Sequence, residues 1–164
     1  MSDFHFVMPT GVAGGPMGGP VADYNAGGSE SDIVCMTKYK TCYFILLLGA
    51  RTGSTAAPVL TVIPYDVAAG TTSTTAIPFL YKRMSSGETN TAWTSSSSLT
   101  VTTGDSQVYC IKVSAQNLPL VSGVKYEYVQ LVSTEPANDP QVGALLIMMA
   151  DARFDEDTLD AVTA

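Results

Sequence analysis

The chain has 164 residues, of which 46% are hydrophobic and 14% are charged, and its formal net charge at pH 7 is −7. Its eight Lys and Arg residues are spread thinly, and without a clustered positive field we expect no nucleic-acid partner. The longest apolar runs, 42–48 and 144–150, have seven residues each, whereas a membrane helix needs about 20, so no membrane partner is expected.

The first 28 residues differ in composition from the rest of the chain. Half of the 14 glycines fall here, together with several prolines, which is too much Gly and Pro to build a core. The segment nevertheless carries apolar residues that a solvated tail would not need: Phe4, Phe6, Val7, Met8 and Val12. We therefore predict an extended, adhesive arm over residues 1–28, a β-sandwich body over 29–154 and an acidic C-terminal tail over 155–164.

From residue 33 onward the sequence predicts strand after strand and no convincing amphipathic helix. Alternation and β-branched or aromatic content mark seven or eight strands. The seven clearest segments are 33–37, 41–49, 59–67, 76–84, 107–114, 126–134 and 142–154, and the Ser/Thr-rich stretch offers short candidates at 91–94 and 99–103. This spacing favours an all-β fold, an antiparallel two-sheet sandwich that is jelly-roll-like. The predicted core residues are Ile33, Phe44, Leu46, Leu60, Val62, Phe79, Tyr109, Ile111, Val129, Leu131, Leu145 and Ile147.

Four local patterns make sharper predictions. Residues 38–40 suit a hairpin connection between the first two strands, and Pro64 indicates a sheet edge or a bulge. Segment 107–114 should place Val108, Cys110 and Lys112 on one face and its other apolar residues on the opposite face. The continuous apolar centre of 142–154 indicates a strand buried on both faces.

Residues suited to catalysis or to cofactor and metal binding are scarce, so we predict no enzyme, no cofactor, no metal and no small-molecule substrate. The sole histidine, His5, lies in the arm without rigid support. The glycine-rich segment 11–20 is not set between a strand and a helix, as phosphate-binding loops are. The acids of 151–160 lack the order of a calcium-binding loop. Cys35, Cys42 and Cys110 cannot all pair, and we expect them reduced and buried in a chain made in the cytoplasm without a signal peptide.

Two further residues are candidates for contacts with partners. Trp93 stands in the Ser/Thr-rich segment, too far from Cys35 for the immunoglobulin pattern, and is expected to anchor that segment on the sandwich or at an interface. Arg153, beside Phe154 and several acids, suits either a surface salt bridge or a pairing between subunits. The predicted interface residues are Phe4, Phe6, Val7, Met8, Val12, Trp93, Arg153 and Phe154.

The body from about Lys38 to Phe154 resembles the small β-sandwich decoration, or cement, proteins of tailed-bacteriophage capsids. The similar features are an aromatic-basic strand at 79–83, a Trp in a Ser/Thr-rich loop, the strands 107–113 and 128–131, and the closing triplet 152–154. This resemblance implies a structural virion protein that binds the outer face of an assembled head, commonly as a homotrimer, with the major capsid protein as partner.

Bridging of neighbouring capsid subunits by body and arm is the function we expect, with the protein located on the capsid surface. Two alternatives remain open. A phage tail or adhesin component shares the sandwich and the Ser/Thr-rich loops. A glycan-binding sandwich is suggested by Trp93 and the tyrosine-rich strands, because an exposed, concave row of aromatic rings stacks on sugars.

Overall fold

The computed structural model describes residues 4–7, 23–24, 28–52, 57–85, 92–102, 106–134 and 140–153, with 4–7 and 85 described by their backbone. Within them the chain forms strands and a single 3₁₀ turn, Ala115–Asn117. No helix in these ranges is long and apolar enough to cross a membrane. The strands are β1 (Phe4–Val7), β2 (Ser29–Glu30), β3 (Val34–Cys35), β4 (Tyr39–Arg51), β5 (Val59–Tyr65), β6 (Phe79–Ser85), β7 (Thr94–Ser96), β8 (Leu99–Thr100), β9 (Gln107–Ser114), β10 (Leu120–Val121), β11 (Val124–Lys125), β12 (Tyr128–Thr134) and β13 (Gln141–Ala152).

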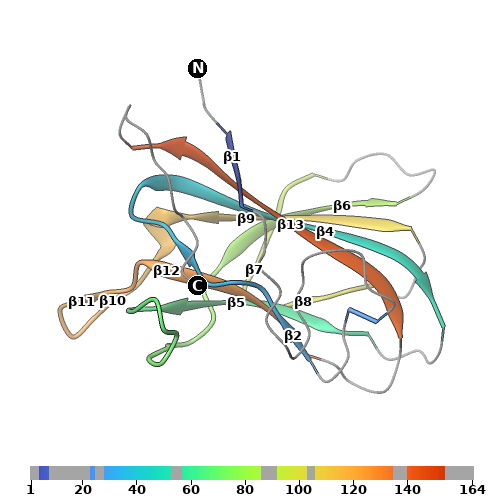
Figure 1. Cartoon of the computed structure of the whole chain (residues 1–164), viewed down its shortest axis with the longest axis horizontal. Helices are drawn as coiled ribbons and strands as arrows, with labels where there is room; N and C mark the ends of the chain where they lie inside the picture. The colour runs from blue at the N-terminus through green and yellow to red at the C-terminus, as the bar shows by residue number, and fades with distance from the viewer. Residues whose placement is uncertain are drawn as a thin grey trace.

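The strands form two antiparallel sheets that pack face to face, which confirms the predicted all-β sandwich. Sheet A has the order β1-β13-β4-β9-β6-β7. Sheet B has the order β2-β12-β5-β8, and β3 also pairs with β12. Figure 1 shows sheet A above sheet B, with the separate β10–β11 hairpin projecting at the left. The jelly-roll connectivity stays a prediction.

The core lies between the sheets and is built from alternate residues of each strand. On β4, Phe44 and Leu46 are completely buried and lie opposite Ile111 and Tyr109 of β9. From sheet B, Leu60 and Val62 of β5 and Val129 and Leu131 of β12 complete the core. Every predicted core residue except Ile33 is buried.

Ile33 corrects one prediction, and the segment around it corrects another. Ile33 is only partly buried, and its Cδ1 lies against Gly70 in the loop after β5. Residues 38–40 are not a hairpin connection, because β3 pairs with β12 in sheet B while β4 pairs with β13 and β9 in sheet A. The turn before Tyr39 therefore carries the chain from one sheet to the other, and Tyr39 itself is buried.

Strand β13 corrects a third prediction. Its residues Leu145, Ile147 and Met149 are buried, but Ala144 and Leu146 on its other face are only half-buried. The strand is thus not covered on both faces, although its sequence is apolar on both. At Pro64 the β8 pairing has ended, but segment 72–77 continues along this side of β5, where the Ile77 N–H donates to the Val62 carbonyl and Tyr65 forms a bridge with Ser73.

Candidate interaction surface

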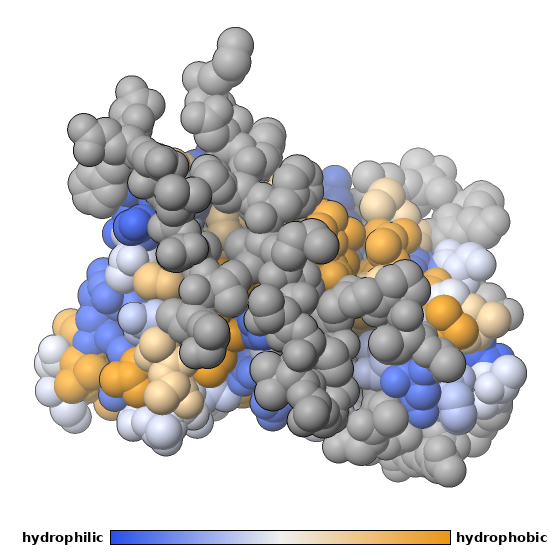
Figure 2. Space-filling model, viewed as in Figure 1, coloured by the Kyte–Doolittle hydropathy of each residue, from blue (hydrophilic) through white to orange (hydrophobic). Residues whose placement is uncertain are grey.

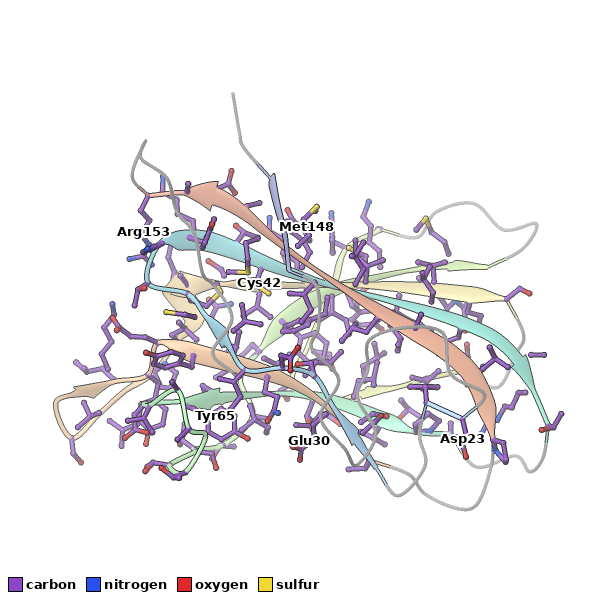
Figure 3. All side chains as sticks on the ribbon, in the orientation of Figure 1. Asp23, Glu30, Cys42, Tyr65, Met148 and Arg153 are labelled. Carbon is purple, nitrogen blue, oxygen red and sulfur yellow. The ribbon has the colours of Figure 1, made fainter. Side chains whose placement is uncertain are left out.

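The face of sheet A that points away from sheet B is the most distinctive surface of the described chain. On each strand its residues alternate with the buried ones, and all of them are half-buried or exposed. We call this set the outer face of sheet A: Leu80, Lys82, Met84, Val108, Cys110, Lys112, Tyr43, Ile45, Leu47, Ala144, Leu146 and Met148. In Figure 3, Met148 lies on this upper side near β1, whereas Cys42 lies on the side of β4 that faces sheet B.

Apolar side chains dominate this face and several reach solvent. Leu47 is 45% exposed, and Leu80 and Met84 are exposed as well. A monomeric soluble protein rarely leaves a large contiguous apolar patch in water, and such patches mark interaction sites. The prediction that Val108, Cys110 and Lys112 share one face of β9 is confirmed, because Tyr109, Ile111 and Val113 are buried on the other.

The two charged residues of the set are both lysines, and each lies over an aromatic ring. The Nζ of Lys82 is 5.1 Å from the ring centroid of Trp93, and the Nζ of Lys112 is 5.8 Å from that of Tyr43. Register places Lys82 directly opposite Cys110, so the two lysines flank this thiol. Burial raises the pKa of Cys110, while the charges of Lys82 and Lys112 act in the opposite direction. This surface is therefore apolar and positive, in a chain whose net charge is −7.

Trp93, one of the predicted interface residues, lies immediately before β7 and belongs to this same surface. It is 41% exposed, and β7 pairs with β6 so that Thr94 lies opposite Tyr81. The indole extends the outer face of sheet A beyond its edge strand. The Trp93 ring contacts Lys82 and still offers much of its surface to solvent, and its role as an anchor of the Ser/Thr-rich segment stays a prediction.

Arg153 is held by the main chain of its own subunit at the start of β4. Its backbone N–H donates to the carbonyl of Lys38 at 2.8 Å, and its Nε donates to the carbonyl of Tyr39 at 3.3 Å. The guanidinium thus ties the end of β13 to the turn where the chain changes sheets. Phe154 lies outside the described residues, as do Met8 and Val12.

The predicted arm contributes two pieces to the sandwich. Phe4–Val7 form β1, which pairs antiparallel with β13 so that Phe4 lies opposite Ala150 and Val7 opposite Ile147. Tyr24 is 3% exposed, and its N–H donates to the carbonyl of Gln141 at 3.0 Å. A Cβ added to Gly143 would lie 2.8 Å from the Tyr24 ring, so only glycine at 143 leaves room for it. The body therefore includes residues that the sequence assigned to the arm.

The β10–β11 hairpin is a second apolar element that projects from the body, and the predicted strands did not include it. Leu120 is 70% exposed, and Val121 and Val124 are also exposed. Ser122 and Gly123 both have positive φ, as the two central residues of a tight hairpin turn require. The Ser-Gly pair between two short apolar segments was the signal that marks it. Figure 2 shows hydrophobic residues at this projecting end of the molecule, at the lower left.

The outer face of sheet B carries one polar cluster that is internally hydrogen-bonded. The Tyr65 hydroxyl donates to Gln130 Oε1 at 2.9 Å, and Gln130 Nε2 donates to the carbonyl of Ser31 at 2.7 Å and to Glu30 Oε2 at 3.4 Å. All eight tyrosines are described, and each is buried or half-buried. The exposed row of rings that a glycan-binding surface needs is not formed by them.

Groups with catalytic or metal-binding chemistry are not brought together in the described ranges. No cluster of three or more His, Cys, Asp or Glu residues there is arranged to hold a metal ion. The three cysteines are free, but only Cys42 is buried as predicted, and burial raises its pKa strongly. The glycine-rich segment 11–20 and the acids of 155–160 lie outside the described residues.

No family model, no curated protein and no solved structure matches this chain.

Proposed function

We propose that this protein is a structural virion component that binds the outer surface of a phage head and stabilises it by bridging neighbouring capsid subunits. The observation that carries the proposal is the outer face of sheet A, which presents exposed Leu47, Leu80 and Met84 to solvent. The resemblance of the body to capsid decoration proteins supplies the kind of partner, the major capsid protein. On this proposal the protein is not an enzyme, carries no cofactor and acts on the capsid surface as a homotrimer.

The energetics of this surface suit binding to a repetitive partner. Fully burying one large apolar side chain contributes about 1.5–3 kcal/mol. Leu47, Leu80, Met84 and Trp93 are each exposed by more than a third, so much of this contribution is still to be gained on binding. Where several subunits are linked, their sites act together and the apparent affinity rises without any new contact. Weak individual contacts thus suffice for a stable coat.

Lys82 and Lys112 indicate the chemistry of the partner surface. Both are half-buried among apolar residues and aromatic rings, where carboxylates of a partner are screened less than in open solvent. The matching surface on the capsid is therefore apolar with acidic residues at its centre. A tail or adhesin component would use the same surface, and it is distinguished by where the protein binds on the particle.

The test uses heads assembled without this chain, to which purified protein is added. We expect Leu47→Asp to weaken binding about tenfold to a hundredfold and to reduce the protection of heads against heat, while Val67→Asp leaves both unchanged. Val67 is the matched control because it is 41% exposed but lies in the loop after β5, off the outer face of sheet A. Binding of wild-type protein to tails and not to heads would support the tail alternative, and binding to neither would end the proposal.

A second variant asks whether the N-terminal segment contributes to binding. Deletion of residues 2–22 removes β1 but keeps Tyr24, which is buried against Gly143. If the shortened protein binds and protects heads as well as the full chain, the segment has no part in bridging, and the body alone acts as cement.

A further inference from the structure

Strand β1 is attached to sheet A by backbone pairing along a strand edge that every copy of this chain carries. Its four residues lie opposite Ile147–Ala150 of β13, whose other edge is paired with β4. Adding an extended segment to a sheet edge requires only main-chain hydrogen bonds and no particular side-chain pocket. The β13 edge of a second copy therefore accepts β1 equally well.

The chain between β1 and Tyr24 contains more residues than this edge requires. Val7 lies opposite Ile147, so six more residues in the same register would bring the chain level with Gln141. At Gln141, however, the residue that bonds is Tyr24, whose N–H donates to the Gln141 carbonyl. Fifteen residues, 8–22, separate Val7 from Asp23, and eight of them are Gly or Pro. Proline lacks the N–H that a ladder needs, so the sequence does not favour continuing β1 along β13.

The number of residues between β1 and Tyr24 determines how far β1 can extend from its own body. Six residues of strand cover about 20 Å. Sixteen steps of extended chain, from Val7 to Asp23, reach about 55 Å. Tyr24 fixes one end of this connection on its own body, because its ring is buried against Gly143. From that fixed point β1 has the length to cross to the β13 edge of a neighbouring copy.

We propose that β1 is exchanged between copies, so that residues 4–7 of one subunit complete sheet A of another. Exchange of an identical element keeps every hydrogen bond of the pairing and is a low-cost route to an oligomer. The exchanged strand would leave the outer face of sheet A exposed, because it adds to the β13 edge, while Ile45 and Leu47 of β4 lie opposite Leu146 and Ala144 of β13.

This inference does not rest on the proposed function, and its test uses the purified protein alone. Two distinguishable chains are refolded together, one carrying Phe6→Cys and the other Met148→Cys, positions that lie opposite each other in the register. Both carry Cys35→Ser and Cys110→Ser, because these two thiols are half-buried, whereas Cys42 is buried with a raised pKa and stays unreactive. Disulfides are then mapped by peptide mass.

We expect a disulfide between residue 6 of one chain and residue 148 of the other. The effective concentration within an exchanged complex is millimolar, so at about 10 μM protein this bond should form about 100-fold faster than a collision product. The collision control replaces Met148→Cys by Lys40→Cys, an exposed position on β4 that is not opposite β1. Circular dichroism of each variant verifies that the sandwich has formed.

Two results would overturn exchange. In the first, the two-chain mixture gives no bond above the control, while the Phe6→Cys/Met148→Cys double variant closes a bond within one chain. In the second, neither arrangement gives a bond, which would mean that β1 does not pair with β13 in solution. Loss of head binding with exchange intact would affect only the proposed function, so the two proposals fail separately.

Discussion

The outer faces of the two sheets lie on opposite sides of one core but meet solvent in different ways. On sheet B a cluster of polar groups is hydrogen-bonded internally: the Tyr65 hydroxyl donates to Gln130, and the Gln130 amide donates to the carbonyl of Ser31. On sheet A apolar side chains such as Leu47 and Leu80 extend into water, and the lysines lie over aromatic rings. Figure 1 shows that the two faces are well separated, one above and one below the sandwich. The two outer faces therefore differ in chemistry: sheet B carries a hydrogen-bonded polar cluster, whereas sheet A presents the apolar side chains that we propose are used for association.

The largest effect is expected from placing a charge on the outer face of sheet A. Leu47→Asp should weaken association with the partner by about tenfold to a hundredfold, because the remaining apolar burial of Leu47 is lost and a carboxylate is desolvated in its place. The free energy of unfolding should change little, since Leu47 is 45% exposed in the isolated chain. Binding isotherms and urea melts of the same samples measure both. A large loss of stability with unchanged binding would reverse the assignment of the two faces.

The outer face of sheet B should respond in the opposite way. Gln130→Leu removes the acceptor of the Tyr65 hydroxyl and the donor to the Ser31 carbonyl at a site that is 7% exposed. Leaving such groups unpaired costs about 1–3 kcal/mol, while binding should be unaffected. Gln116→Leu, at an exposed position of the 3₁₀ turn, is the control and should be neutral in urea melts. Equal effects of the two substitutions would mean that the hydrogen bonds of Gln130 contribute nothing to stability.

The sequence predicted much of the fold because most strands have a buried side and a solvent side. Strand β9 is the clearest example, since its bounds and both of its faces agree with the prediction. Strand β13 was misread for a physical reason: its outer face is apolar without being covered, and periodicity alone does not separate that case from full burial.

The candidate surface depends on pairings between distant segments, which the sequence did not reveal. Lys82 meets Trp93 because β6 pairs with β7, and Tyr24 enters the core because Gly143 leaves space for its ring. The local pattern of apolar and polar residues predicts neither contact. Arg153 shows the same limit, because its hydrogen bond to the Tyr39 carbonyl follows from the β4–β13 pairing, and its sequence neighbours do not indicate that contact.

A smaller effect is expected at the Lys82–Trp93 contact on sheet A. A double-mutant cycle with Lys82→Met and Trp93→Leu should give a coupling energy of about 0.5–1 kcal/mol, typical of an exposed cation–π pair. The same cycle on Lys112 and Tyr43 should give less, since the nitrogen lies 5.8 Å from that ring centroid compared with 5.1 Å at Trp93. Urea melts measure both cycles. A coupling of zero at Trp93 would leave the Ser/Thr-rich segment without this anchor.

The smallest effect concerns the pH dependence contributed by sheet B. Burial, and then the negative charge of Glu30, raise the pKa of Tyr65 above its usual value. The folded protein therefore holds the phenolic proton more tightly than the unfolded chain, whose tyrosines titrate near pH 10. This contribution to stability is present in full below about pH 10 and is lost as the pH rises through the folded pKa. The stability advantage of wild type over Tyr65→Phe should accordingly shrink from pH 10 upward, as measured by urea melts at pH 8–12. In Glu30→Gln the second cause is absent, so the folded pKa lies closer to the unfolded value and the total loss of stability should be smaller. An advantage that stays constant across this range would show that the Tyr65 proton is not linked to folding.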